Sequence, residues 1–436
     1  MTTRQDCLDR DAADPLAAAR DRFSLPDGMI YLDGNSLGAL PVAAAEVVRE
    51  AVERQWGADL IASWNKHGWI GLPQKVGGKI ARLIGAGADE VVAADSVSVN
   101  LFKLAAAAVG AQDGRRVVLT EGGDFPTDLY ILQGLAGMIP DVELRVVEPG
   151  GIEAALDDRV AVVLLSHVHY RSGAVRDMAG LNAAIRAVGA LSLWDLSHSA
   201  GVLDVDLNRD GADLAAGCGY KYLSGGPGAP AYLFVARRHQ AALRNPLSGW
   251  MGHARPFDFV DDYAPAAGID RWLCGTPPIL SLTALNAALA AFDGVDMVAA
   301  RAKAGTLGDL FIERVETRCA GQGLTLASPR DASARGGQVS FTHPRGWPMM
   351  QNLIARGVIG DFRAPDVIRF GFAPLVSEVW GASPAPCPCQ RREQHARHHH
   401  HHRRRCGAGQ QRNIGIRPGP GAAQHHDGRG RGGSGG

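Results

Sequence analysis

Short apolar runs alternate with amphipathic segments along the first half of this chain, and this alternation constrains the fold more than any other feature. Strand-like runs occur at residues 90–94, 116–119, 143–147, 160–165 and 191–196. Segment 178–188, between the last two runs, has the period of an amphipathic helix. This order predicts an α/β fold, in which a mostly parallel sheet lies between two layers of helices. In such a sheet, ligands bind beyond the carboxyl ends of the strands.

The flanking segments complete the expected architecture. Before the sheet, the pattern predicts a strand at 29–32 and helices at 14–22, 42–56, 73–84 and 101–109. Toward the C-terminus it predicts long helices at 275–292 and 297–317, a helix at 347–355, and strands at 338–341 and 367–372. These later elements predict a smaller α/β unit packed against the large one.

Composition narrows the class of protein. Apolar residues make up 46% of the 436 residues, enough for a large core. We find no apolar run of the ~20 residues needed to span a bilayer, and the first residues lack the pattern of a secretory signal. The seven cysteines are scattered without the spacing of a metal site. These features predict a reduced, cytoplasmic protein with no bound metal and no membrane partner.

Charge is distributed unevenly along the chain. The formal net charge is zero, but residues 376–436 hold ten arginines against three acidic residues, whereas residues 1–375 hold 35 basic and 42 acidic residues. The acidic main body therefore offers no general electrostatic attraction for nucleic acid, and we expect no nucleic-acid partner.

The segment 376–436 also differs in its residue types. It is rich in Gly, Arg, His, Pro and Gln, and it contains five consecutive histidines, His398 to His402. Because it has too little apolar surface to offset chain entropy, we expect it to be disordered. The helix and strand pattern stops in mid-element near Leu375, so a frameshift or sequencing error is the favoured explanation. A native disordered tail and a metal- or RNA-binding tail are the alternatives.

A lysine in a glycine-rich run is the first candidate for chemistry. Lys221 lies between Tyr220 and Tyr222, ahead of the Ser-Gly-Gly-Pro-Gly run at 224–228. Enzymes that use pyridoxal 5′-phosphate (PLP) attach the cofactor to one lysine amine, and glycines let the backbone approach it closely. A surface lysine beside a turn would give the same pattern, so this motif alone does not distinguish a PLP-binding lysine from a surface lysine.

An acidic residue ends the strand-like run before that lysine. Asp195 stands 26 residues before Lys221, and His198 follows it by three. A carboxylate at the end of a parallel strand lies in the binding crevice, and PLP needs an acidic partner to keep its pyridine nitrogen protonated. A helix cap or a buried ion pair is the alternative for Asp195, and a structural role is the alternative for His198.

Two further features suit a phosphate and a planar ring. In the polar turn 95–100, Val97 and Ser98 offer N–H groups and a hydroxyl at the start of the helix predicted from Leu101. An ordinary helix cap is the alternative. Phe125 follows a strand and could stack on a ring, although a core position would explain it equally.

Together these residues resemble the kynureninase family, which are fold-type I PLP enzymes similar to class V aminotransferases. The resemblance runs from about Tyr31 to Leu375, and several motifs in one order are more specific than any single motif. The matching strings are residues 32–38, 125–128, 195–201, 219–223, 249–250, 275–278 and 369–372. The chain departs from the family after Leu375, where the family continues with further helices of its small domain.

The resemblance implies a role for each matching residue. Lys221 would hold PLP and carry protons, Tyr220 would be a second proton carrier, and Asp195 would pair with the pyridine nitrogen. Other cofactor contacts would come from Val97, Ser98, Phe125, Pro126, Thr127, Asp128, Ser166, His198, Trp250 and Thr276.

The resemblance also implies how substrate binds. Arg369 would bind the α-carboxylate, a task that suits the guanidinium fork. Ser36 and His67 would lie near the aromatic end of the substrate. In the family, the position of Thr276 reaches over from the partner subunit, which implies a homodimer with a shared active site.

The implied reaction is hydrolysis of the Cβ–Cγ bond of L-kynurenine and 3-hydroxy-L-kynurenine, in tryptophan catabolism and NAD biosynthesis. The products would be L-alanine with anthranilate or 3-hydroxyanthranilate. The alternatives are another fold-type I enzyme such as a cysteine desulfurase or an aminotransferase, a catalytically impaired PLP-binding remnant, and an RNA-binding protein that uses the basic tail. A desulfurase needs a nucleophilic cysteine on a loop of the small domain, whereas Cys319 lies near a predicted helix end.

The resemblance also implies the domain boundaries. Residues 1–45 would contribute to the small domain and the active site, and residues 46–290 would form the large PLP-binding domain. Residues 291–375 would form a truncated small C-terminal domain, followed by the tail at 376–436.

Overall fold

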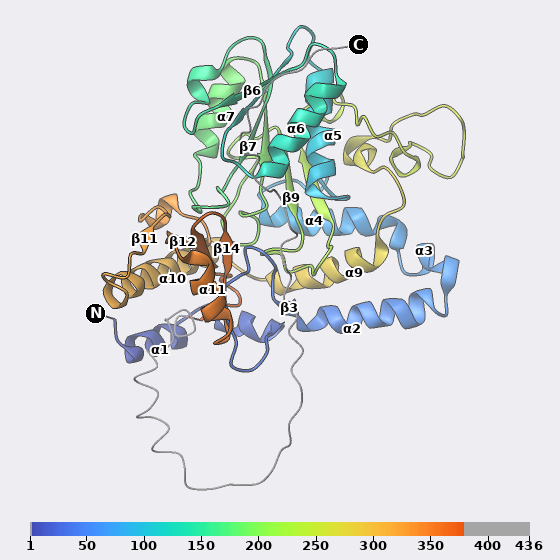
Figure 1. Cartoon of the computed structure of the whole chain (residues 1–436). Helices are drawn as coiled ribbons and strands as arrows, with labels where there is room; N and C mark the ends of the chain where they lie inside the picture. Colours follow the sequence, from blue (N-terminus) through green and yellow to red (C-terminus); the bar gives the residue numbers. More distant parts are fainter. Residues whose placement is uncertain (1, 379–436) are drawn as a thin grey trace, which may run out of the picture. The chain divides into compact units, whose positions relative to one another are not determined.

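A seven-stranded sheet forms the centre of the computed structural model, which describes residues 2–378 (Figure 1). Its strands are β4 (Val91–Ala93), β5 (Val117–Glu121), β6 (Glu143–Val147), β7 (Val160–Ser166), β8 (Leu191–Asp195), β9 (Leu214–Cys218) and β10 (Ala231–Val235). The spatial order is β4-β10-β9-β8-β7-β5-β6. Only β10 runs against its neighbours, β4 and β9, and the other pairs are parallel. The predicted α/β fold with a mostly parallel sheet is therefore confirmed.

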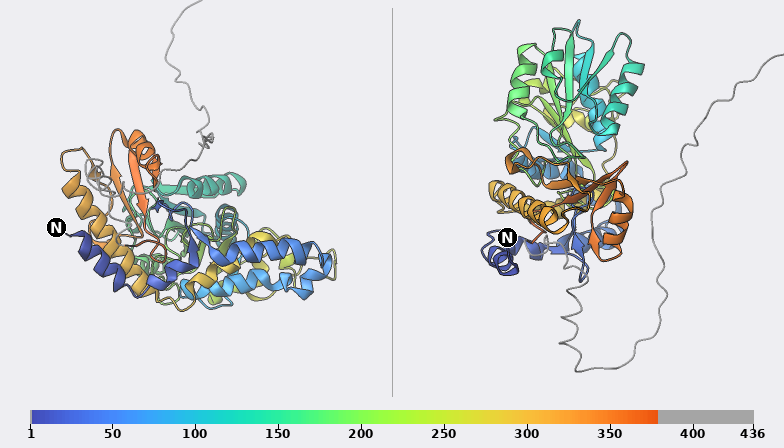
Figure 2. Two further views of the ribbon diagram at one scale, coloured as in Figure 1. Left: turned by 90° about the horizontal axis from the view of Figure 1, so that it is seen from below. Right: turned by 60° about the vertical axis from the view of Figure 1, so that its left-hand side comes forward.

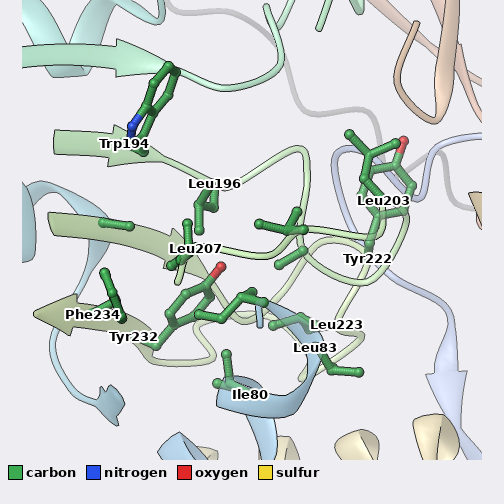
Figure 3. Packing of buried hydrophobic residues seen from close by; sticks show 14 of the residues in the cluster. Ile80, Leu83, Trp194, Leu196, Leu203, Leu207, Tyr222, Leu223, Tyr232 and Phe234 are labelled. Carbon is green, nitrogen blue, oxygen red and sulfur yellow. The ribbon is translucent and has the colours of Figure 1, made fainter. Parts of the chain in front are cut away.

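Helices cover both faces of this sheet. They include α4 (Leu72–Leu83), α5 (Val97–Gly110), α6 (Pro126–Met138) and α7 (Met178–Ala187). Successive residues of β8 point to opposite faces, because Leu193 packs in the core under α5 and α6 while Trp194 packs in the core beside α4 and α7. Figure 3 shows the second of these cores around Ile80 and Trp194. A parallel sheet needs this burial on both faces.

A smaller antiparallel sheet follows in the chain. Its order is β11-β12-β15-β14, and the strands are β11 (Thr325–Leu326), β12 (Gln338–Thr342), β14 (Asp361–Arg363) and β15 (Val367–Gly371). The 22-residue helix α10 (Met297–Arg318) and the helix α11 (Gly346–Ile354) pack on this sheet (Figure 2). Rings of Phe311, Phe370 and Phe372 meet in its core, with Phe311 and Phe370 centroids 4.8 Å apart. This is the predicted smaller α/β unit.

The N-terminal segment packs against the small sheet and then leads to the large one. It contains α1 (Arg4–Ala12), β1 (Phe23–Ser24), β2 (Ile30–Tyr31), β3 (Leu40–Pro41) and α2 (Val42–Glu50), which continues as a π-helix over Ala51–Trp56. β2 pairs in parallel with β13 (Val358–Ile359), and Cys7 and Leu32 join the core around Phe311. The loop after β2 therefore lies between the two sheets: Asp33 bridges to Gly371, and the Gly38 N–H donates to the Tyr220 carbonyl at 2.8 Å.

Several local predictions were wrong. The helix predicted from Leu101 begins at Val97, because the Ser96 side chain caps it by accepting from the Val99 N–H. The helix predicted over 275–292 is α9 (Ile279–Ala288) with a short 3-10 extension, since Pro277 and Pro278 cannot continue a helix backward. In the predicted helix 14–22, only Ala17–Arg22 is helical, as a 3-10 turn. Two further helices, α3 (Ser63–Lys66) and α8 (Arg237–Gln240), are short.

The folded chain continues past the expected boundary at Leu375. Leu375 and Val376 are buried in the core beside α4 and α7, and Ser377 is buried as well. The prediction of disorder for the tail concerns residues that, beyond Glu378, lie outside the described part of the chain. Among residues 2–378, no single helix is long and apolar enough to cross a membrane. One bent pair of helices, Ile279–Phe292 and Met297–Arg318, has sufficient length and apolar composition only when the two are taken together.

Candidate functional site

A cavity of about 220 Å³ lies at the carboxyl ends of the large sheet's parallel strands. Its walls come from the segments that follow β4, β5, β8 and β9, where side chains from separate strands meet. The lining residues are Ser96, Val97, Ser98, Phe125, Thr127, Asp128, Asp195, Ser197, Cys218, Tyr220, Lys221, Ala229 and Ala231. A wider hollow of about 540 Å³ shares Ser96, Tyr220 and Ala229 with it, and includes Leu37 and Pro278. Most of the predicted cofactor residues are therefore in one place.

Lys221 is held in the cavity by the loop after β9. Its Nζ lies 3.0 Å from Nε2 of His198, which is buried. Burial, followed by the charge of Lys221, lowers the pKa of His198 well below its usual value, so the ring is neutral and can accept a hydrogen bond from the lysine side chain. Close packing surrounds this lysine: a Cβ on Gly38 would come within 2.3 Å of the Lys221 carbonyl oxygen, so only glycine fits there.

Two carboxyl groups line the same cavity. Asp195 ends β8, where the register places it beside Ser166 of β7, and its Oδ1 accepts from the Ser197 N–H at 2.8 Å. The Ser166 hydroxyl donates to Asp128 Oδ2 at 3.5 Å. Burial, then the negative charges of Asp195 and Asp124, raise the pKa of Asp128 well above its usual value. Asp128 Oδ1 is buried and, among residues 2–378, has no hydrogen-bond partner, so a cationic N–H donor would suit this end of the cavity.

The first turn of α5 supplies a different environment. Val97 and Ser98 begin this 14-residue helix and line the cavity, where free N–H groups and the helix dipole favour an anion. Phe125 stands at the start of α6, just before Pro126, with its ring centroid 5.8 Å from Lys221 Nζ. The ring of Phe125 packs edge-on against Tyr170, at a centroid separation of 5.3 Å.

These features fit PLP. The lysine amine suits the cofactor aldehyde, the carboxyl pair with its unsatisfied oxygen suits the pyridine nitrogen, the start of α5 suits the phosphate, and Phe125 suits the planar ring. His198, Ser166 and Pro126 do not line the cavity, but each adjoins a residue that does.

Arg369 lies outside the cavity lining and is fully committed to other groups. It is 1% exposed. Its Nε donates to Asp361 Oδ1 at 2.6 Å, and its Nη2 donates to Asp361 Oδ2 and, at 3.2 Å, to Ser36 Oγ. Its Nη1 donates to the Tyr170 carbonyl. The structure thus brings Arg369 and Ser36 together, and adds Asp361 as a partner that sequence reasoning missed.

Three predicted residues lie apart from the cavity of this chain. His67 follows α3, where its Nε2 is 2.7 Å from Asp59 Oδ2. Trp250 packs edge-on against Phe257 at 5.9 Å, and Thr276 is exposed. None of the three lines the cavity of its own chain.

Sequence reasoning also missed a charged network behind the cavity. Arg176 pairs with Asp124 at 3.0 Å and with Glu121 at 2.9 Å, and Asp124 accepts from the Ser166 N–H at 3.1 Å. Glu121 ends β5 and Asp124 follows it, so a carboxylate after a parallel strand was the available signal.

The comparisons with known proteins agree with this geometry. The sequence model of the kynureninase C-terminal domain matches residues 300–382. The chain is 50% identical over 391 residues to the kynureninase of Burkholderia mallei (strain SAVP1), covering 88% of this chain and 94% of the relative. The kynureninase of Pseudomonas fluorescens gives the same identity and coverage.

Solved structures at lower identity share the fold. A mutant of C-DES, with glycine covalently linked to its PLP cofactor, has a TM-score of 0.71 at 19% identity, covering 83% of this chain and 96% of that one. An apo cysteine desulfurase from Thermococcus onnurineus NA1 has a TM-score of 0.69 at 19% identity, covering 84% and 94%. At these identities the likeness concerns the fold alone. By its sequence identity to curated relatives over nearly its whole folded length, this chain belongs to the kynureninase family.

Proposed function

We propose that this chain is a PLP-dependent kynureninase, which hydrolyses L-kynurenine to anthranilate and L-alanine and also accepts the 3-hydroxy substrate. The observation that carries this proposal is the placement of Lys221 and Asp195 in one cavity with the first turn of α5. Membership of the kynureninase family supports the choice among the reactions that such a site could perform. The reaction belongs to tryptophan catabolism and NAD biosynthesis.

PLP, when bound through Lys221, withdraws electrons from the bonds at the substrate α-carbon. The protein holds the cofactor and sets its charge. Asp195 and Asp128 would hold the pyridine nitrogen in its protonated form. Phe125 would stack on the ring, and the N–H groups of Val97 and Ser98 would hold the phosphate. Pro126, Thr127, Ser166 and His198 would complete the cofactor contacts from this chain, whereas Trp250, which lies apart from this cavity, could contact the cofactor only in a partner's cavity.

Lys221, Tyr220 and His198 move and hold protons. The Lys221 amine removes the α-proton of the substrate and returns protons later in the cycle. Burial raises the pKa of Tyr220 to about 12, so its hydroxyl keeps a proton to donate at neutral pH. Neutral His198 accepts from Lys221 and keeps the amine pointed into the cavity.

Substrate is bound at two ends. Arg369 holds the α-carboxylate, as its place beside Ser36 and the loop after β2 suggests. Binding requires the guanidinium to share or exchange its present partners, Asp361 and the Tyr170 carbonyl. His67 contacts the aromatic end of the substrate. Ser36, whose hydroxyl accepts from Arg369 Nη2, lies beside the carboxylate end rather than at the aromatic end that the resemblance implies.

We further propose a homodimer in which each cavity is completed by the partner. Thr276 and His67 lie away from the cavity of their own chain, as residues that serve a partner's cavity would. Exposed apolar side chains gather in the segment that carries His67, where Ile61 is 80% exposed, and in the loop after Trp250, where Phe259 is 77% exposed. Burial of such side chains is the usual driving force for a dimer.

The proposed location is the cytoplasm. The cysteines among the described residues, Cys7, Cys218, Cys274 and Cys319, are all free thiols. Free thiols are the expected state in a reducing compartment. A desulfurase reaction is not favoured, because Cys218 is buried in the cavity wall on the large sheet and Cys319 caps α10.

The direct test is release of anthranilate from L-kynurenine by the holoenzyme, followed by its fluorescence. Loss of this activity in Lys221→Ala, in a protein that still folds, supports the proposal. Release of sulfide or persulfide from cysteine, with no anthranilate from kynurenine, would favour the desulfurase instead.

A further inference from the structure

Four charged residues meet where the loop after β2 touches the small sheet. Asp33 bridges to Gly371, the last residue of β15. Asp361 and Arg369 stand opposite each other in the register of β14 and β15, and Arg363 is two residues along β14. We call Asp33, Asp361, Arg363 and Arg369 the arginine cluster.

Within the arginine cluster, both cations pair with the same carboxylate. Arg369 binds Asp361 through Nε and Nη2, and Arg363 Nη2 lies 3.0 Å from Asp361 Oδ2. The Ser36 hydroxyl adds a hydrogen bond to Asp361 Oδ2 at 2.5 Å. Asp33 makes no ion pair with any described residue, and its Oδ1 is buried without a hydrogen-bond partner. An ionised carboxylate in that position would lack the partner that burial demands.

We propose that Asp33 is protonated in the form of the enzyme that binds substrate, and that its neutral state leaves the arginine cluster with one net positive charge for the substrate α-carboxylate. This inference rests on the proposed role of Arg369. The charge count explains why the proton matters. Two guanidinium groups against Asp361 alone leave one positive charge, whereas an ionised Asp33 would cancel it and face the incoming carboxylate with none.

Burial and one neighbouring carboxylate favour the neutral form of Asp33, and they outweigh the groups that favour its ionised form. Burial, followed by the negative charge of Asp361, raises the pKa of Asp33 to about 7, although Ser36, Arg369 and Arg363 act in the opposite direction. Burial also raises the pKa values of Tyr31 on β2 and Tyr222 after β9, so neither phenol brings a charge.

Asp361 is the member of the pair that keeps its charge. Burial acts to raise its pKa, but the hydrogen bond and charge of Arg369 together with Arg363 hold the pKa below its usual value. The proton therefore belongs to Asp33. As the pH rises through about 7, Asp33 ionises and the positive charge available to the substrate disappears.

The first measurement is the KM of the holoenzyme for L-kynurenine between pH 6 and pH 8.5. In the wild type, KM rises by about tenfold between pH 6 and pH 8, because the protonated fraction of Asp33 falls by that factor. In Asp33→Asn, KM does not show this rise between pH 6 and pH 8. Asp33→Ser serves as the second variant if Asp33→Asn does not fold. Asp27→Asn, at an exposed position on the preceding turn, follows the wild type.

The second measurement does not depend on turnover. Calorimetry of L-alanine binding at pH 8, in two buffers of different ionisation enthalpy, counts the protons taken up. The wild type takes up close to one proton more than Asp33→Asn, and the two proteins become equal at pH 5.5. Equal proton uptake at pH 8, or a wild-type KM profile in both Asp33 variants, overturns the inference.

Arg369→Lys distinguishes a failure of the Asp33 inference from a failure of the proposed carboxylate binding by Arg369. A rise in KM in Arg369→Lys, combined with an unchanged pH profile in Asp33→Asn, overturns the role of Asp33 alone. An unchanged KM in Arg369→Lys overturns the carboxylate site and the Asp33 inference together, while the anthranilate activity itself still stands.

Discussion

Nζ of Lys221 lies 3.0 Å from Nε2 of His198, and burial keeps that ring neutral. A neutral ring can accept a hydrogen bond from the lysine side chain and so orient it, whereas a doubly protonated imidazole has no acceptor nitrogen. The pair thus links the loop after β9 to the carboxyl end of β8, where Asp195 stands.

Replacing His198 tests this orientation. His198→Phe removes the acceptor and leaves the Lys221 side chain without its partner, which corresponds to a fall in kcat of about 10- to 100-fold. The measurement is steady-state anthranilate release at pH 7.5. His343→Asn, which alters a histidine just after β12 and outside the cavity lining, retains wild-type kcat. Equal kcat values in His198→Phe and the wild type would show that the contact has no part in catalysis.

Asp195→Asn tests the charge at the pyridine end of the cavity. An amide cannot keep the pyridine nitrogen protonated, so kcat falls by at least ~100-fold, the usual scale for loss of a preorganised charge. The comparison is kcat at matched PLP content, which absorbance measures separately. If full activity persists in Asp195→Asn, the nitrogen does not rely on this carboxylate.

Asp33→Asn tests the arginine cluster through stability. A carboxyl group whose pKa is raised by folding stabilises the fold below its usual pKa of 3.8, and that stabilisation is lost as the pH rises through about 7. Thermal unfolding should therefore show Asp33→Asn gaining about 1 to 3 kcal/mol over the wild type between pH 4.5 and pH 8, since each pKa unit corresponds to about 1.4 kcal/mol. Asp27→Asn shows no such gain. A constant difference between Asp33→Asn and the wild type at both pH values contradicts the shifted pKa.

Mixing two inactive variants tests the shared active site. Lys221→Ala lacks the cofactor lysine, and His67→Phe lacks a residue that we assign to the partner's cavity. Random exchange of subunits gives half heterodimers, each with one intact cavity, so activity returns to about a quarter of the wild-type value. No recovery, under conditions where labelled subunits do exchange, would place His67 in the cavity of its own chain or outside catalysis.

The sequence predicted five of the seven strands of the large sheet, all except β9 and β10, and most of the cavity, because polar residues mark the ends of the apolar strands. Asp195 closes an apolar run, and Lys221 lies in a glycine-rich turn, so both were placed before any geometry was known. β9 was missed because Leu214-Ala215-Ala216-Gly217-Cys218 has no β-branched residue, and its neighbours in the sheet supply the pairing that its own propensity lacks.

Contacts between residues far apart in the chain could not be predicted from the sequence. Asp361 and Arg369 meet through the register of an antiparallel pair, and a shift of one residue would have sent Asp361 to the other face. The unpaired state of Asp33 depends on a bridge to Gly371, more than 300 residues away in the chain. Local patterns in a single sequence carry no information on such contacts.

We propose that Lys221 both binds PLP and acts in kynurenine hydrolysis, and a paired measurement on the wild type and Lys221→Ala tests both roles. Purified wild-type protein, reconstituted with PLP, should show a visible absorption band and release fluorescent anthranilate from L-kynurenine. Lys221→Ala, with the same fold by circular dichroism, should lose both signals. Anthranilate release by Lys221→Ala at the wild-type rate would show that Lys221 is not the catalytic lysine.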